Sequence, residues 1–404
     1  MSVERVSLRV SPDPTLRVPE AETLPSRPLL DPNGPVVILG GQRESQFAPM
    51  AIAPSPNTLF GPRGACLVSP DGPLWVSDTG HHRILGWKTC PTVDNTPADW
   101  VIGQPNFTSE GRNAKHEPGP STLNVPTGIC SDGQYLVVAD AWNHRVLIWR
   151  SLPTHDNQAA DVVLGQDDFL QNESNRGKQS TTTVDSFHWP YGILIHEGKL
   201  MVADSENRRV LIWNDIPTHS GQVADVVLGQ PNFTQRDENA GAQPSAMSMR
   251  WPHDIAVWCG HLCVADAGNN RIMIWNGIPQ ENGAPCDFIL GQTDFNCVDH
   301  NQALYWPRAN SVNMPYGVSA INEWLLVADT ANSRLLGWHI DDLHNGSNAQ
   351  ALTGQMNFHD KGDNRWQPQV ADSLCWPYGL QVVGNMAVVA DSGNNRVHLW
   401  KLNP

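Results

Sequence analysis

The sequence predicts an all-β fold, a six-bladed β-propeller with four-stranded blades. Three residues recur together along the chain: an Asp, an Arg five positions later, and a Trp four positions after the Arg. The copies of the Asp lie 62 to 64 residues apart, at Asp78, Asp140, Asp204, Asp266, Asp329 and Asp391. Self-similarity at a fixed period is the signature of a repeat architecture.

Each copy contains three short strands, and residues 251–275 show them most clearly. Two apolar runs at 255–257 and 262–265 flank a tight Gly-His turn, and a third run at 271–275 follows a Gly-Asn-Asn turn. Apolar runs bounded by Gly and Asn are typical of antiparallel strands. The first strand begins after a proline, whose missing N–H is harmless there, at Pro62, Pro126, Pro190, Pro252, Pro315 and Pro377.

A fourth strand ends in Gly-Gln, and its missing sixth copy predicts how the ring closes. Its Gly follows the repeat Trp by 16 residues in five copies, and a sixth would fall beyond Pro404. The matching sequence VVILGGQ stands at residues 36–42 instead. A linear array would leave strand edges exposed, so we expect residues 36–39 to pair with residues 396–400 and complete the last blade of a ring.

This pattern predicts one folded domain at residues 35–404, with residues 35–44 as the closing strand of blade 6. Blades pack only on their neighbours, so length adds blades rather than domains. Residues 1–34 read as an extended, Pro-rich arm, and we expect them to lie outside the ring.

Composition restricts the partners. The net charge of −15, with 26 Lys and Arg against 41 Asp and Glu, argues against nucleic acid, whose phosphates need basic clusters. No apolar run approaches the roughly 20 residues of a membrane helix, and residues 1–34 lack a signal-peptide core. Eight Cys without a CxxC pair fit reduced thiols. We therefore expect an acidic, cytoplasmic monomer that binds neither nucleic acid nor membrane.

The repeated sequence resembles a known family. Pro-x-Gly, followed by VADxxNxR and an apolar strand, is similar to the NHL repeat, and Asn143, His144 and Arg145 come close to the tripeptide of that name. The resemblance covers roughly residues 36–400, and the GQPNF-type segments resemble those of bacterial NHL proteins with enlarged blades. It implies a binding platform, with a few enzymes in the family. Fold alone does not fix function.

Residues that recur in all six copies are expected to do structural work. We expect the Asp and Arg to form an ion pair that braces the loop between strands two and three, and the Trp to pack between blades. The segment from Gln to the next Pro runs 20 to 24 residues and lies on the same face. We expect these long segments to form an outer annulus, and their tryptophans to crowd one rim: Trp189, Trp251, Trp306, Trp366 and Trp376.

Function is expected where the copies differ. The position between Pro and Gly, at the entry to the central channel, is occupied by Arg63, Thr127, Tyr191, His253, Tyr316 and Tyr378. The Gly itself becomes Asp254 in blade 4 alone. These are the polar groups of a small-ligand or anion site. The alternative is that the side chains plug the channel and bond to backbone and water.

A metal site has weaker support. Pro-His at a strand start resembles peptidyl-hydroxyglycine lyase, an NHL-like propeller enzyme. The resemblance implies zinc ligands at this position on three blades. Only His253 matches here, and a catalytic zinc needs three protein ligands. His82 and His144, at matching loop positions, are further metal candidates or solvated loop residues. No cofactor is expected apart from a possible divalent metal, and no catalytic residue is assigned.

Two functions remain open from the sequence. The first is a protein-interaction platform that binds a partner on the long-loop face. The alternative is a small-ligand binder, or a metal-dependent enzyme of lyase or hydrolase type, at the channel mouth. There Arg63 would bind an anion, and His253 with Asp254 would transfer a proton or hold a divalent ion.

Overall fold

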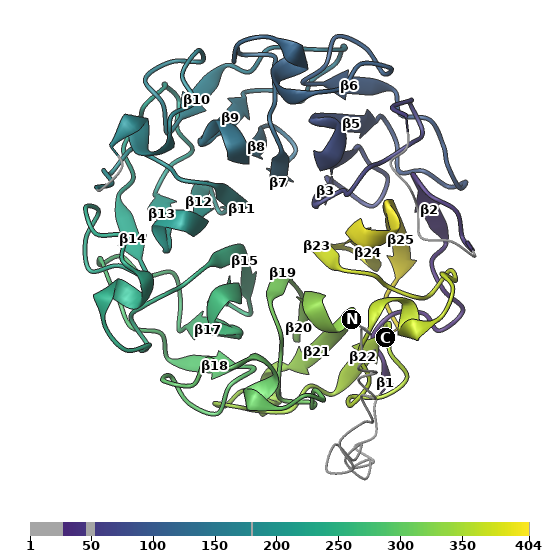
Figure 1. Cartoon of the computed structure of the whole chain (residues 1–404), viewed down its shortest axis with the longest axis vertical. Coiled ribbons are helices and arrows are strands. Elements are labelled where there is room, and N and C mark those ends of the chain that lie inside the picture. Colours follow the sequence, from purple (N-terminus) through teal and green to yellow (C-terminus); the bar gives the residue numbers. More distant parts are fainter. Residues whose placement is uncertain (1–26, 46–52, 179–180, 404) are drawn as a thin grey trace, which may run out of the picture.

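The computed structural model describes residues 27–45, 53–178 and 181–403. Its strands form six antiparallel blades arranged in a ring around a central channel (Figure 1). The predicted fold class is therefore confirmed. In each blade the first strand lines the channel and the fourth lies at the outer rim (Figure 1).

The strand bounds follow the predicted repeat. Blades 1 to 3 comprise β3 (Gly64–Leu67), β4 (Leu74–Asp78), β5 (Arg83–Trp87) and β6 (Trp100–Ile102); β7 (Pro126–Ser131), β8 (Leu136–Asp140), β9 (Arg145–Trp149) and β10 (Val162–Leu164); and β11 (Pro190–His196), β12 (Lys199–Asp204), β13 (Arg209–Trp213) and β14 (Val226–Leu228). Blades 4 to 6 comprise β15 (Pro252–Trp258), β16 (His261–Asp266), β17 (Arg271–Trp275) and β18 (Phe288–Leu290); β19 (Pro315–Ile321), β20 (Trp324–Asp329), β21 (Arg334–His339) and β22 (Ala351–Thr353); and β23 (Pro377–Val383), β24 (Met386–Asp391) and β25 (Arg396–Lys401).

The remaining elements are short 3-10 helices in the loops. Six follow the second strands: η1 (Thr79–His81), η3 (Ala141–Asn143), η5 (Ser205–Asn207), η7 (Ala267–Asn269), η9 (Thr330–Asn332) and η12 (Ser392–Asn394). The others lie in the long segments or after β21: η2 (Arg112–Lys115), η4 (Ser174–Gly177), η6 (Glu238–Gly241), η8 (His300–Ala303), η10 (Ile340–Asp342) and η11 (Asp363–Trp366).

The N-terminal strand closes the ring as predicted. Strand β2 (Val37–Leu39) pairs antiparallel with β25, with Val37 opposite Leu399 and Leu39 opposite Val397. Blade 6 therefore takes its fourth strand from the other end of the chain. Figure 1 shows β2 beside β25 at the junction of the two ends of the colour scale.

The arm enters the ring earlier than predicted. Strand β1 (Arg27–Pro28) pairs in parallel with β22, so blade 5 has five strands. Leu29 and Leu30 are buried between blades 5 and 6. The expectation that residues 1–34 lie outside the ring is wrong for residues 27–34, because Leu29 and Leu30 gain burial there. Residues 1–26 fall outside the described residues.

A repeated contact explains this position. In blades 1 to 5, the loop between strands three and four covers the outer strand of the preceding blade, as where Asn157 N donates to Val101 O at 2.7 Å. In blade 6 no loop joins strands three and four, because its fourth strand is β2 from the N-terminal side of the chain. The segment from Arg27 takes its place, and Leu29 N donates to Leu352 O of β22 at 3.1 Å. It thereby covers an edge strand that would otherwise be open.

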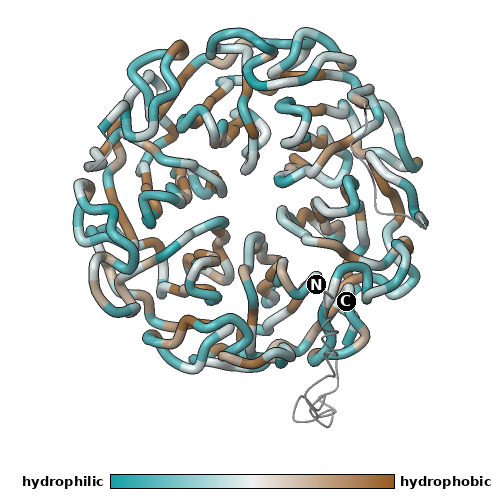
Figure 2. Tube along the Cα trace, in the orientation of Figure 1, coloured by the Kyte–Doolittle hydropathy of each residue, from teal (hydrophilic) through white to brown (hydrophobic). Residues whose placement is uncertain are grey.

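Apolar side chains fill the seams between neighbouring blades rather than one central core. Figure 2 shows alternating hydrophobic and hydrophilic stretches around the whole ring. The repeat tryptophans lie in these seams, and each indole Nε1 donates to a backbone carbonyl at 2.8 to 3.0 Å. In blade 6 that carbonyl belongs to Asp31, so the arm again supplies the missing loop. The predicted inter-blade packing of the Trp is confirmed.

The repeated Asp and Arg form buried ion pairs in all six blades, with Nε to Oδ2 distances of 2.6 to 3.0 Å. The predicted ion pair is confirmed, and the Arg makes more contacts than predicted. In blade 4, Arg271 also donates to Phe295 O, Ser245 O and Ser248 O of the two adjoining long segments. The Arg therefore ties the long segments to the blade, and Asp266 Oδ1 binds Arg250 N at the approach to the inner strand.

Candidate site at the channel mouth

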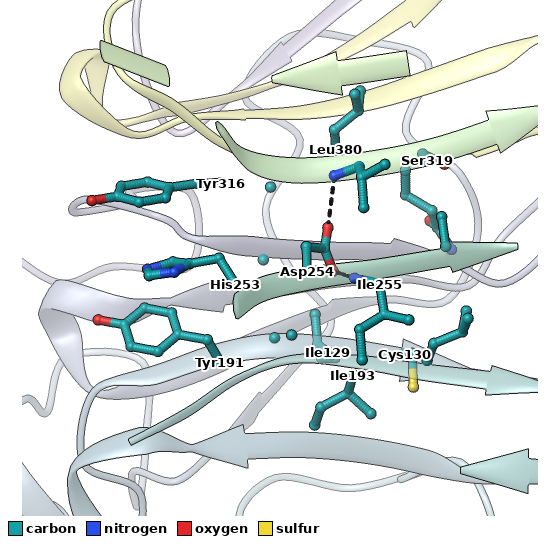
Figure 3. A pocket seen from close by; sticks show the side chains of 18 of the residues that line it. Ile129, Cys130, Tyr191, Ile193, His253, Asp254, Ile255, Tyr316, Ser319 and Leu380 are labelled. Atoms are coloured by element: carbon teal, nitrogen blue, oxygen red, sulfur yellow. Dashed lines mark hydrogen bonds between the residues drawn. The ribbon is translucent and has the colours of Figure 1, made fainter. Parts of the chain in front are cut away.

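Five of the six variable side chains form a closed ring at the entrance to the channel. Ring centroids lie 4.5 Å apart between Tyr191 and His253, 4.2 Å between His253 and Tyr316, and 4.6 Å between Tyr316 and Tyr378. The Arg63 guanidinium lies 4.8 Å from the Tyr378 ring and donates to the Tyr191 hydroxyl at 3.0 Å, which completes the circle. Figure 3 shows Tyr191, His253 and Tyr316 side by side at the ends of their strands.

The ring determines the charge at the mouth. Burial, together with the nearby Arg63, lowers the pKa of His253 to about 4, although the bond between Nδ1 and Trp251 O at 3.0 Å acts in the opposite direction. Burial also raises the pKa of Tyr316 and Tyr378. At neutral pH these three rings are therefore uncharged, and Arg63 supplies the positive charge of the ring.

Thr127, the sixth variable residue, lies in the channel wall but outside the ring. Its side chain is buried, and its hydroxyl lies 3.3 Å from both Pro190 O and Tyr191 O of blade 3. It therefore joins blade 2 to blade 3. The repeat position between Pro and Gly therefore does not by itself place a polar side chain in contact with the ring.

Directly behind the ring, glycines allow the inner strands to approach each other closely. A Cβ on each would overlap the carbonyl of the mouth residue in the next blade. This applies to Gly64, Gly128, Gly192, Gly317 and Gly379. Close packing of backbones thus explains why Gly follows two residues after Pro in five blades.

Asp254 replaces this glycine in blade 4 and links blades 4 and 5. Its Oδ1 accepts a hydrogen bond from Ile255 N and its Oδ2 accepts one from Val318 N of β19, both at 3.0 Å (Figure 3). Burial raises the pKa of its carboxyl to about 7, although both bonds favour the charged form. Asp254 and apolar side chains such as Ile129, Ile193 and Leu380 line a cavity of about 240 Å³.

Replacing Asp254 with Asn should remove a pH-dependent loss of stability. The folded pKa of about 7 lies above the ordinary value of about 3.9, so folding favours the protonated form. That contribution is fully present below about pH 4 and is lost as pH rises through 7. We expect the melting temperature of the unmodified protein to fall relative to Asp254→Asn as pH rises. The exposed Asp215→Asn is the control, and a difference that stays constant with pH would contradict this assignment.

The two loop histidines bridge blades rather than meet each other. His82 Nδ1 lies 3.0 Å from Val125 N, and His144 Nδ1 lies 3.2 Å from Trp189 N, each in the following blade. Asn270, Ser333 and Asn395 accept the equivalent bond elsewhere in the ring. Burial lowers the pKa of His82 to about 4 and that of His144 to about 3. They are therefore uncharged acceptors in a repeated inter-blade contact.

The metal candidates do not form a ligand set. Among the described residues, no group of three or more His, Cys, Asp or Glu side chains is placed to hold a metal ion. His82 and His144 serve separate seams, and His253 is stacked between two tyrosines. The side chains that surround His253 do not fit a three-ligand zinc site.

A cleft of about 500 Å³ opens on the long-loop face next to the ring, over blades 6, 1 and 2. We call it the mouth cleft, and its side-chain walls include Phe60, Arg63, Arg112, Trp142, Trp376 and Tyr378. Arg112 lies 4.9 Å from the Trp142 ring, which stacks on Trp189 with centroids 6.2 Å apart. Arg112 and Trp142 were not among the predicted site residues. One feature of the sequence could have pointed to them. Each stands at a repeated loop position that other residue types occupy in the remaining blades.

Comparison with known proteins supports the repeat and leaves the function open. The NHL repeat model matches residues 249–275. A search of curated proteins finds no match. No helix in the described part of the chain is long and apolar enough to cross a membrane.

Solved structures with a similar course of the chain are distant in sequence. A Bacteroides thetaiotaomicron protein of unknown function is 10% identical, with 89% of this chain and 73% of that chain covered and a TM-score of 0.48. Hydrazine synthase of Kuenenia stuttgartiensis is 12% identical, with coverage of 85% and 96% and a TM-score of 0.49. Virginiamycin B lyase of Staphylococcus aureus is 13% identical, with coverage of 87% and 98% and a TM-score of 0.40.

The architecture and the repeat are established by the blades themselves and by the family match. The chain is a six-bladed β-propeller in which residues 249–275 match the NHL repeat.

Proposed function

We propose that this propeller is a binding platform for a protein partner, which docks on the long-loop face over the channel mouth. The observation that carries the proposal is a group of exposed tryptophans around the mouth. Trp142, Trp251 and Trp376 are each 36% to 38% exposed. Trp and Arg are enriched at interface positions that dominate binding energy.

Local structure supports a rigid binding face. Trp251 and Trp376 stand directly before the prolines that start β15 and β23, and Trp142 lies in η3. The indole of Trp251 donates to Glu206 Oε1 at 2.9 Å, and Trp142 is held between Arg112 and Trp189. Side chains that are fixed before binding lose less entropy when a partner docks.

We further propose a cytoplasmic setting, which the cysteines support. All eight are free thiols. Burial raises the pKa of Cys66, Cys130 and Cys263, so these three favour the protonated form that is inert toward disulfide exchange.

The platform can be tested by capture from native extract with the full chain. We expect the unmodified protein to retain a stoichiometric partner and the double variant Trp142→Ala, Trp376→Ala to lose it. Trp366→Ala is the matched control, because Trp366 is 67% exposed and lies outside the lining of the mouth cleft. Equal capture by the double variant, or no partner at all, would refute this function.

A further inference from the structure

The mouth cleft is a positively charged site on an acidic protein. Its lining includes two arginines, Arg63 and Arg112, and no Asp or Glu. The whole chain has 41 acidic residues against 26 Lys and Arg. Within residues 27–45, 53–178 and 181–403, neither arginine forms an ion pair with a carboxylate. A pair of uncompensated guanidinium groups in one hollow is suited to an anion.

Both guanidinium groups are held in place by aromatic rings rather than by acids. Arg63 lies over Tyr378 and donates through Nη1 to Tyr191, which leaves its other N–H donors available. Arg112 is exposed and lies over Trp142. Stacked arginines keep their fork of donors oriented. Carboxylates accept such a fork in a bidentate, charge-assisted contact.

The remaining walls are mainly aromatic, and Thr79, His82 and Ser392 are their polar side chains. Phe60, Trp142 and Trp376 line the cleft together with the backbone of Gly61 and Gly80. Gly80 packs against Phe60, since a Cβ there would overlap the Phe60 ring. Aromatic walls of this kind favour a planar, apolar body through offset or edge-to-face contacts. The volume of about 500 Å³ lies within the usual range of small-ligand sites, about 300–1,000 Å³.

From this combination we infer that the mouth cleft binds an aromatic carboxylate, with its carboxylate at Arg63 and Arg112 and its ring against Phe60, Trp142 and Trp376. The same chemistry has two possible sources. One is a free aromatic acid. The other is a carboxylate beside an aromatic side chain on the partner, and this second source rests on the proposed platform function.

Calorimetric titration of the purified full chain with 3-phenylpropionate tests the inference. We expect 3-phenylpropionate to bind and the neutral 3-phenylpropanamide, which has the same ring, to bind at least about tenfold more weakly, since charged hydrogen bonds are the strong ones. Arg63→Gln and Arg112→Gln should each weaken 3-phenylpropionate binding by about tenfold. Added salt should weaken it as well.

Arg150→Gln is the matched control, because it removes an equal charge at an exposed position just after β9, outside the cleft. It should bind 3-phenylpropionate as the unmodified protein does. Arg112 is exposed, so Arg112→Gln keeps the test valid even if Arg63→Gln disturbs the ring of side chains. Absence of binding, equal binding of the amide, or unchanged affinity in both cleft variants would overturn the inference.

A competition arm separates the two sources. If the carboxylate comes from the partner, excess 3-phenylpropionate should release the partner that the unmodified protein captures. If the partner stays bound while the probe occupies the cleft, the source is a free acid. The platform function has its own criterion, the loss of capture in Trp142→Ala, Trp376→Ala, so failure of one proposal is distinguishable from failure of the other.

Discussion

Deleting residues 1–44 should leave the protein unable to maintain its closed ring at ordinary temperatures. The deletion removes β1, β2 and five buried side chains, Leu29, Leu30, Val37, Ile38 and Leu39. Each contributes about 1.5–3 kcal/mol when fully buried. Their combined loss is comparable to the whole folding free energy of a typical protein, about 5–15 kcal/mol. Thermal unfolding followed by circular dichroism measures the effect.

Two shorter deletions make this prediction specific. Deleting residues 1–26 keeps both β1 and β2, so the melting temperature of this variant is the reference for the other two. Deleting residues 1–30 removes β1, Leu29 and Leu30 but keeps β2, so its melting temperature should fall between the other two. Equal melting temperatures for all three proteins would show that neither strand secures the ring.

Arg271→Ala should destabilise the protein by about 3–5 kcal/mol, the usual cost of removing one partner of a buried ion pair. Arg271 is fully buried, and its loss leaves Asp266 without its cation. It also leaves Phe295 O, Ser245 O and Ser248 O without this donor. Denaturant unfolding with a shared slope for both proteins gives the difference in free energy.

Arg250→Ala is the control for that substitution. Arg250 precedes the same inner strand and pairs with Glu238, but its side chain and that of Glu238 are 47% and 52% exposed. Exposed ion pairs contribute about 0–1 kcal/mol. A loss for Arg271→Ala no larger than for Arg250→Ala would mean that the repeated Asp–Arg pair does not hold the blade together.

The sequence predicted the ring because its repeated Asp, Arg and Trp make the same hydrogen bonds to the backbone in every blade. Asp266, Arg271 and Trp275 each bond to the main chain at fixed offsets, so their spacing reports the strands directly. The pairing of β2 with β25 followed from the same spacing. Strand β1 was not predicted because the loop that it replaces shares only a small polar residue among blades 1 to 5, and the bond of that residue to the preceding blade becomes apparent only in the structure: Asp94, Asp156, Ser220, Asn282 and Asn345. Its segment is held by the pairing with β22, by the buried Leu29 and Leu30, and by the carbonyl of Asp31.

The candidate site was predicted in its residue types but not in its contacts. The position between Pro and Gly correctly gathers Tyr191, His253 and Tyr316. Its spacing does not reveal that Arg63 reaches Tyr191 or that Thr127 bonds within a seam. The mouth cleft was not predicted from the sequence, because it lies between loops from blades 6, 1 and 2. Side chains from loops with no shared register meet only in the folded ring.

The closing segment also bears on how the chain is made. Strand β2 is synthesised before the first blade, and its partner β25 follows the strands of all the other blades. Until β25 leaves the ribosome, Val37, Ile38 and Leu39 have no partner strand, and an unpaired apolar strand is a template for pairing with another chain. Contacts this distant in sequence also form slowly. Refolding at high concentration is therefore expected to let one chain donate β1 to the fifth blade and β2 to the sixth blade of another, producing strand-swapped oligomers.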